Sequence, residues 1–268
     1  MTSQLPHGMS SRGPADIRPE TTHSVNFSET LSNLAKNSAH LQTLFDSYVQ
    51  LGDVEQVIKL LEEDKTQCFY TPSNTEYIEI MRDLRDSLVQ SDEDFIKGYR
   101  VLAINQWDVE QERIILITTR RVYHIKTNSA GVLVKATITH ITDICRMVWG
   151  PVFSNRFEYD SNGNQTFAIR LFTEEGVDPE NLTLKEKMNS DFCSFKTYKP
   201  KISNNETIES PTIHRKVTKE MAGIIECAMR YYRLQADMVW SSSYVQEAEV
   251  TRKSSALGMS RIIGLFSS

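Results

Sequence analysis

The sequence has few of the features that mark secreted, membrane-spanning or metal-binding proteins. Its longest apolar runs fall well short of the roughly 18 residues that a transmembrane helix requires. The N-terminal stretch contains no apolar segment of the kind found in secretory signals. The cysteines lie far apart, with no CxxC pair and no histidine at zinc-finger spacing: Cys68, Cys145, Cys193 and Cys227. We therefore expect a cytoplasmic protein with reduced thiols and without a metal ion or other cofactor.

Positive charge is not in excess either. The formal net charge is −5 and the pI is near 5.8, a balance that argues against a general nucleic-acid binder. Glycine-rich phosphate loops are absent, and His40, His124 and His140 lie apart along the chain. We interpret His124, which follows Tyr123 on a predicted strand, as an edge residue whose hydrogen bonds are satisfied. The residues alone therefore indicate no catalytic set.

The pattern of residues divides the chain into four parts. Residues 1–27 are polar and proline-containing, and we expect them to be disordered. Residues 28–64 form a helical extension, in which two apolar stripes are separated by Gly52–Asp53. The sequence leaves two alternatives for this extension: it packs on the domain, or it packs on a partner protein. Residues 65–240 form the main domain, and residues 241–268 form a C-terminal tail.

Within the main domain the apolar period predicts a helix, then strands, then a helix. The first helix runs from about Asn74 to Val89 and the last from Lys219 to about Met238. The predicted strands are Tyr99–Asn105, Glu112–Thr118, Arg121–Lys126, Val132–His140, Asp143–Val148, Thr166–Phe172 and Phe192–Tyr198. We expect turns at Ser129–Gly131 and Gly150–Pro151. In the strand from Val132, alternation predicts one apolar face, formed by Val132, Val134, Ala136 and Ile138.

About seven strands followed by one amphipathic helix predict an α+β fold. A strongly bent antiparallel sheet of that size leaves one end open, and an amphipathic helix can close it. That is the pleckstrin-homology-like arrangement, to which the N-terminal helices would be an extension.

The stretch from Trp107 to Thr118 carries a resemblance to a known family. The pattern begins with Trp107 and, after four further residues, continues with Glu112–Arg113, an apolar run and Thr118. It resembles the corresponding pattern in the Mover family, the tumour-protein-p-sixty-three-regulated proteins. The core of that family is the Sac-two homology domain. Weaker matches are Phe69–Tyr70, the FAIRL strand at Phe167–Leu171, and the tail residues Leu257–Gly258, Ser260–Arg261 and Gly264–Phe266.

The resemblance implies both a fold and a function. The fold would be pleckstrin-homology-like, and the protein would form a homodimer. It would associate peripherally with vesicle membranes or presynaptic machinery and bind other proteins there, as an adaptor and not as a catalyst. We interpret Trp107 and Arg113 as structural residues of this domain.

A phosphatase interpretation rests on one weak pattern. Sac-type phosphatases use the cysteine and arginine of a C-x5-R loop, and this chain has such a spacing from Cys227 to Arg233. The segment contains no glycine and falls inside the predicted C-terminal helix, where backbone N–H groups are already bonded within the helix. We expect no inositol phosphatase activity, and we expect Cys227 to face the sheet.

Basic residues define the candidate lipid site. The loop between the first two strands, Gln106 to Glu112, is acidic and would repel phosphates. The candidate lipid-binding residues therefore lie elsewhere: Arg120, Arg121, Lys126, Lys135, Arg146 and Arg156. Lys126 and Lys135 should approach each other across a hairpin, while Arg146 and Arg156 flank the expected Gly150–Pro151 turn. The alternative is that these charges are simply scattered over the surface.

The tail from Thr251 to Ser268 is a second membrane candidate. It combines cations with apolar side chains, of which we single out Arg252, Lys253, Arg261, Ile262 and Phe266. A short basic and apolar segment can lie in a membrane interface. The same tail can equally pack on the domain or on a second copy. The leading interpretation is a peripheral vesicle adaptor that binds phosphoinositides, and the alternative is a dimeric scaffold that binds only proteins.

Overall fold

The computed structural model describes residues 27–63, 69–71, 75–105, 109–154, 156–160, 163–173, 192–197 and 213–252. The chain divides into two compact units, Met1–His40 and Leu41–Ser268. The sheet and the buried apolar clusters belong to the second unit. The predicted disorder up to residue 26 and the tail from Lys253 lie outside the described residues.

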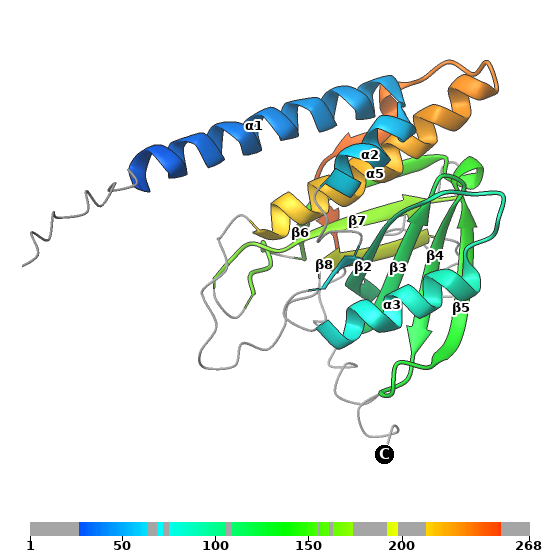
Figure 1. Ribbon diagram of the computed structural model, residues 1–268. Coiled ribbons are helices and arrows are strands. Elements are labelled where there is room, and N and C mark those ends of the chain that lie inside the picture. Colours follow the sequence, from blue (N-terminus) through cyan, green and yellow to red (C-terminus); the bar gives the residue numbers. More distant parts are fainter. Residues whose placement is uncertain are drawn as a thin grey trace, which may run out of the picture. The chain divides into compact units, whose positions relative to one another are not determined.

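In the sequence, helices precede and follow a run of strands (Figure 1). The helices are α1 Phe27–Leu51, α2 Val54–Glu63, α3 Thr75–Leu88 and α5 Ile213–Gln235, with short 3-10 turns η1 Ile141–Asp143 and η2 Ser242–Tyr244. The strands are β1 Phe69–Tyr70, β2 Phe95–Ile104, β3 Glu110–Thr118, β4 Arg121–Thr127, β5 Leu133–His140, β6 Arg146–Phe153, β7 Phe167–Phe172, β8 Phe192–Thr197, β9 Val245–Glu247 and β10 Val250–Thr251.

The strands form one sheet in the order β10-β6-β7-β8-β2-β3-β4-β5, with β1 also on β2 and β9 also on β6. The predicted α+β class, with a large sheet and a C-terminal helix, is confirmed. The predicted number of strands is wrong, because the sheet has ten. The three additional strands are two or three residues long and pair in parallel with distant segments. So short a strand carries no alternation that a sequence pattern could reveal.

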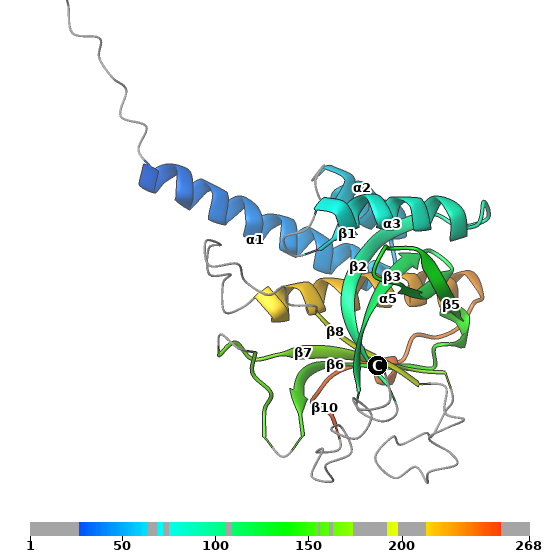
Figure 2. The same cartoon turned by 90° about the horizontal axis from the view of Figure 1, so that it is seen from below.

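Strand β3 reads as a continuous apolar run because both of its faces are covered. Ile115 and Ile117 belong to the core formed with α5, whereas Ile114 and Leu116 belong to a second cluster formed with α3. Successive side chains on a strand point to opposite faces, so each face of β3 receives one alternate set. Figures 1 and 2 show α5 and α3 on opposite sides of β2, β3 and β4.

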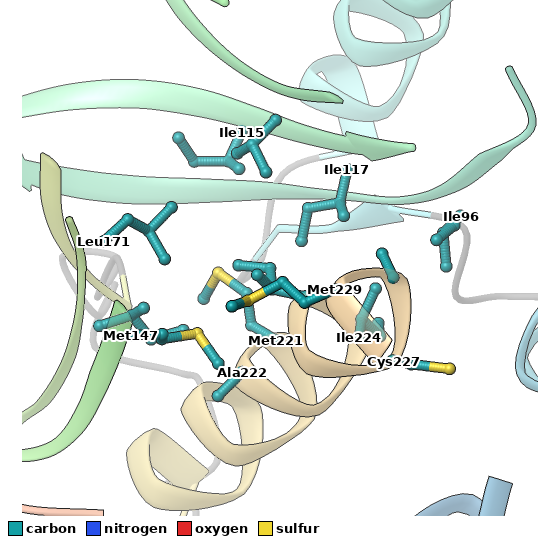
Figure 3. Packing of buried hydrophobic residues seen from close by; sticks show 14 of the residues in the cluster. Ile96, Ile115, Ile117, Met147, Leu171, Met221, Ala222, Ile224, Cys227 and Met229 are labelled. Atoms are coloured by element: carbon teal, nitrogen blue, oxygen red, sulfur yellow. The ribbon is translucent and has the colours of Figure 1, made fainter. Parts of the chain in front are cut away.

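Helix α5 supplies much of the main core. Figure 3 shows its Met221, Ile224 and Met229 side chains directed toward Ile115 and Ile117 of β3. Because hydrophobic stabilisation scales with apolar area removed from water, this contact is a principal source of the stability of the second unit. A polar tether adds to it. The Tyr99 hydroxyl and the Lys97 ammonium of β2 both lie 2.6 Å from one carboxylate oxygen of Glu220 on α5.

The outer side of α5 is covered by the end of α1 and by α2. Phe45 and Val49 of α1 pack against it, with Gly223 leaving the space that the Phe45 ring occupies. The end of α1 and helix α2, which belong to the predicted extension, therefore pack within the same chain. Cys227 lies on this side too, with its sulfur 3.8 Å from the Tyr48 carbonyl oxygen. The prediction that Cys227 faces the sheet is wrong, as Figure 3 shows.

The turn predicted at Gly150–Pro151 is also wrong. Strand β6 runs through both residues and pairs them with β7. On its other side β6 pairs with β9 up to Trp149 and with β10 from Val152, so the interruption between these ladders falls opposite Gly150 and Pro151. Proline lacks an N–H, so it is tolerated at such an interruption. Glycine is needed because a Cβ at Gly150 would lie 2.1 Å from the Ala248 carbonyl oxygen.

Candidate functional site: the β4–β5 hairpin

Arg120 lies in the tight turn between β3 and β4, Arg121 begins β4, and ion pairs hold both side chains. Their guanidinium groups lie 2.9 Å and 3.2 Å, respectively, from the Asp92 carboxylate. The hydrogen bond from Arg121 is the main reason why the pKa of Asp92 is lowered. Arg121 also lies 3.2 Å from Glu93. These two arginines therefore already have carboxylate partners, and their ion pairs hold the β3–β4 turn against the loop before β2.

Glu93 is the buried member of this cluster. Its carboxylate accepts hydrogen bonds from the hydroxyls of Thr118 and Tyr123 and from the backbone N–H of Gln90. Burial by itself raises the pKa of the Glu93 carboxyl, but these hydrogen bonds and Arg121 outweigh burial, so the pKa is lowered. The arrangement fixes the β3–β4 turn to the segment that precedes β2.

Lys126 and Lys135 meet as predicted. They are paired directly across the β4–β5 hairpin, and both side chains are exposed. Neither has a carboxylate partner in the part of the chain that the structure describes. Like charges placed directly opposite each other on neighbouring strands repel, so this pair favours an external anion.

Exposed aliphatic side chains lie beside the lysine pair. Val132, Leu133 and Val134 are 59 %, 40 % and 54 % exposed. The predicted apolar face is largely exposed, because β5 is the last strand of the sheet: Val132, Val134 and Ile138 are exposed, and Ala136 is half-buried. The adjoining turn is fixed by Gly131, whose φ of +76° and close approach to Ile80 of α3 leave no room for a side chain.

The remaining predicted cations lie elsewhere. Arg146 is on β6, at the other end of the antiparallel run of strands from β5, and its guanidinium stacks 4.1 Å from the Phe172 ring centroid. Arg156 lies in the connection between β6 and β7 and lines a hollow of about 680 Å³ together with Phe153 and Phe157. The structure therefore brings together only Lys126 and Lys135 from the predicted set, apart from the adjacent arginines at the β3–β4 turn.

Arg252 is the one highlighted tail residue that the structure describes. Its guanidinium lies 2.5 Å from Glu110 and 2.9 Å from Glu158, and Lys196 bridges the same two carboxylates. Arg252 is thus part of an ionic network on the sheet. The predicted membrane residues Lys253, Arg261, Ile262 and Phe266 lie outside the described residues, as does Trp107.

The C-x5-R segment lies wholly within α5, as predicted. Burial, and then the carboxylates of Asp53 and Glu226, raise the pKa of the Cys227 thiol to about 12. The Arg233 guanidinium is buried, donates to the Ile144 carbonyl at 3.0 Å, and stacks on the Tyr244 ring. A protonated thiol and an occupied guanidinium provide no phosphate loop.

One polar cavity was not predicted from the sequence. It has a volume of about 450 Å³, and Arg113, His124 and Cys193 line it. His124 is not an edge residue, because β4 lies between β3 and β5. The alternation of β3, β4 and β8 placed these three residues on the face that carries Ile115, Val122 and Phe195. Only the pairing of distant strands shows that they share one cavity.

No helix in the described part of the chain is long and apolar enough to cross a membrane. The described residues also contain no cluster of three or more histidine, cysteine, aspartate or glutamate side chains that could hold a metal ion.

Comparison with known proteins gives one family match. Residues 74–172 match the family model described as "hSac2: Inositol phosphatase". No curated protein matches the chain. A solved structure, the hSac2 domain from human phosphoinositide phosphatase Sac2, is 10% identical, and the match covers 69% of this chain and 94% of that chain. Its TM-score is 0.39, too low to support a structural argument.

Proposed function

We propose that this chain is a non-catalytic peripheral membrane adaptor that binds anionic lipid, phosphoinositides included, through the β4–β5 hairpin. The observation that carries the proposal is the facing pair Lys126 and Lys135 beside exposed Val132, Leu133 and Val134. An interface of this composition suits a bilayer, since the ammonium groups contact phosphates while the aliphatic groups enter the layer beneath them.

The expected free energy of membrane binding is that of a reversible interaction. Each lysine near an anionic surface contributes about 1 kcal/mol, and burying an exposed valine or leucine side chain contributes roughly 1.5–3 kcal/mol. Together these terms bring the protein to a membrane without anchoring it permanently. Two lysines carry limited headgroup specificity, so a dependence on anionic lipid density is expected first.

The proposed role rests on the resemblance at Trp107–Thr118, which lies inside the segment matched by the family model. That resemblance supports an adaptor in vesicle trafficking or presynaptic regulation, located on the cytoplasmic face of vesicles. The order β6-β7-β8-β2-β3-β4-β5, with α5 packed on the sheet, supports assignment to the pleckstrin-homology-like folds. Such folds present hairpin loops to membranes.

The experiment is co-sedimentation of the full chain with vesicles of neutral lipid, of neutral lipid with phosphatidylserine, and of neutral lipid with phosphatidylinositol bisphosphate. Lys126→Glu/Lys135→Glu should weaken binding to the two anionic vesicles at least about tenfold, which corresponds to 1.4 kcal/mol. Val132→Ser/Leu133→Ser should weaken binding while leaving its salt dependence unchanged.

The matched control is Lys59→Glu/Lys216→Glu. Both lysines are exposed, on α2 and α5, away from the hairpin, and the double substitution changes the net charge by the same amount. Equal losses in the two double variants would show a general charge effect and would contradict a hairpin site. Unchanged binding in both would contradict it as well.

A second function is favoured by the position of β5. It is an eight-residue strand at the end of the sheet, and an exposed edge can pair with another chain. Self-association through two β5 strands would make the protein a dimeric scaffold, the alternative that binds proteins only. Light scattering after size exclusion distinguishes it: Ile138→Lys, at a residue that is 44 % exposed, should give monomers if β5 is the contact.

A further inference from the structure

Residues of five strands line the polar cavity: β2, β3, β4, β5 and β8. Cys193 lies on β8, where it pairs with β7, and His124 lies on β4, where it pairs with Thr137 of β5. Strands β2 and β3 lie between β8 and β4 in the sheet. Side chains from β8 and β5 can line one cavity only because the sheet curves around it. Arg113 of β3 projects into this space.

Arg113 brings a positive charge that no carboxylate neutralises within the described residues. Its guanidinium donates to the Glu112 carbonyl at 2.6 Å and to the Gln111 side-chain oxygen, both of which are neutral. The Glu112 carboxylate is directed instead to Arg100, 2.8 Å away. Burial lowers the pKa of Arg113, as expected for a cation that has lost hydration without gaining an anion.

Two further polar side chains at the cavity, His124 and Cys193, are neutral donors at physiological pH. Burial, and then Arg113, lower the pKa of His124 to about 4, and burial raises the pKa of Cys193 to about 12. The imidazole therefore carries one N–H, and the thiol keeps its proton, with Sγ 3.1 Å from Nδ1. A protonated thiol is a poor nucleophile, so the cavity is suited to binding and not to covalent chemistry.

The balance of charge selects the ligand. One guanidinium offers the planar fork that fits a carboxylate in a bidentate manner. Asp143 also lines the cavity, and its charge disfavours a second negative charge on a ligand, such as that of a phosphomonoester. Ala103, on the same face of the sheet as Arg113, supplies an apolar contact. The volume lies toward the lower part of the range of about 300–1,000 Å³ typical of small-molecule pockets.

We propose that this cavity binds a small organic monocarboxylate, with its carboxylate on Arg113 and its apolar part against Ala103, which lies on the same face of the sheet. Thr137 and Thr139, which line the same cavity, offer hydroxyl donors to the ligand. The site is separate from the lysine pair, because Lys126 and Lys135 do not contribute to the described lining, and it does not depend on membrane binding.

The test is titration of the 15N-labelled full chain, followed by NMR, with acetate, butyrate and benzoate, and in parallel with inorganic phosphate and inositol trisphosphate. Saturable shifts centred on Arg113, His124 and Thr137 with butyrate or benzoate support the proposal. The expected Kd is about 1 mM, because ligands of this size have few atoms to contribute. Saturation by the phosphates alone would overturn it, as would the absence of binding by all three acids.

Two variants and one control locate the site. Arg113→Gln should weaken butyrate binding at least tenfold, whereas Arg113→Lys should retain part of it. Arg215→Gln is the control, since Arg215 is exposed on α5 and paired with Glu247. If Arg113→Gln does not fold, Thr137→Val on the exposed strand β5 replaces it, with an expected loss of severalfold. Butyrate binding unaffected in the folded variant would contradict the assignment.

Discussion

The Arg121 guanidinium lies 3.2 Å from the carboxylate of Glu93, whose side chain is completely buried. This pair explains why a cation chosen as a lipid ligand from the sequence serves the fold instead. Glu93 lies before β2 and Arg121 begins β4, so the pair joins two segments that β2 and β3 separate in the chain. A buried carboxylate stays charged only when hydrogen bonds and a cation surround it, and Glu93 has both.

Glu93→Gln should lower the free energy of unfolding at pH 7 by about 1–3 kcal/mol, because buried donors lose a charged acceptor. The pKa of Glu93 is lowered in the folded protein from its ordinary value of 4.5, so its stabilising effect is present above that value and is lost as the pH falls below it. Urea unfolding at pH 7 and pH 3.5 measures this. Asp92→Asn, at an exposed partner of the same arginine, should have a smaller effect at pH 7. A difference between wild type and Glu93→Gln that persists undiminished at pH 3.5 would contradict the assignment.

His124 should make the protein less stable in mild acid. Its pKa is lowered from 6.5 to about 4 on folding, so between these values the unfolded chain binds a proton that the folded chain does not. Stability therefore falls as the pH drops through this window, by about 2 kcal/mol between pH 7 and pH 5. His124→Gln should remove this loss, whereas His140→Gln, at an exposed position, should retain it. Parallel pH dependence in the two variants would exclude His124 as the source.

Gly150→Ala should detach the segment that follows β9. The new Cβ would lie 2.1 Å from the Ala248 carbonyl oxygen, a backbone atom that cannot turn aside. We expect a loss of about 1–3 kcal/mol and faster hydrogen exchange at the Ala248 amide, which donates to the Trp149 carbonyl at 3.0 Å. The Ile169 amide on β7 is an internal reference that should keep its protection. Unchanged exchange at Ala248 would show that β6 can shift to admit the methyl group.

Phosphatase activity should be absent. Cys227 is a protonated thiol inside α5, and Arg233 is occupied by the Ile144 carbonyl. Purified wild type and Cys227→Ser should both release no phosphate from phosphoinositide vesicles in a colorimetric assay. Release by the wild type that disappears in Cys227→Ser would overturn the non-catalytic assignment.

The fold was predictable where the signal was local. The alternation and turn spacing around β3 and β4 located that hairpin to within two residues. The start of α5 was missed by six residues, at Ile213 instead of Lys219, because polar Arg215 and Lys216 obscure its first turn. The short strands β9 and β10 were missed entirely, since their stability comes from pairing with β6 and not from their own residues.

The candidate sites could be predicted only in part, because most of them depend on contacts between segments that are distant in the sequence. The pairing of Lys126 with Lys135 follows from the length of one hairpin, so the sequence predicted it. The partners of Arg120 and Arg121 could not be predicted, because Asp92 lies on a different segment and carries no pattern. The same holds for the cavity: Arg113, His124 and Cys193 become neighbours only through the curvature of the sheet.

The most direct measurement of hairpin insertion is the emission of an environment-sensitive fluorophore attached to Leu133→Cys, recorded with vesicles containing phosphatidylserine or phosphatidylinositol bisphosphate. Leu234→Cys, at an exposed position on α5, is the reference, and unsubstituted protein treated identically corrects for the native thiols. We expect a blue shift for the label at position 133 with anionic vesicles, none with neutral vesicles, and none at position 234. Binding to anionic vesicles with an unshifted label at position 133 would contradict hairpin insertion.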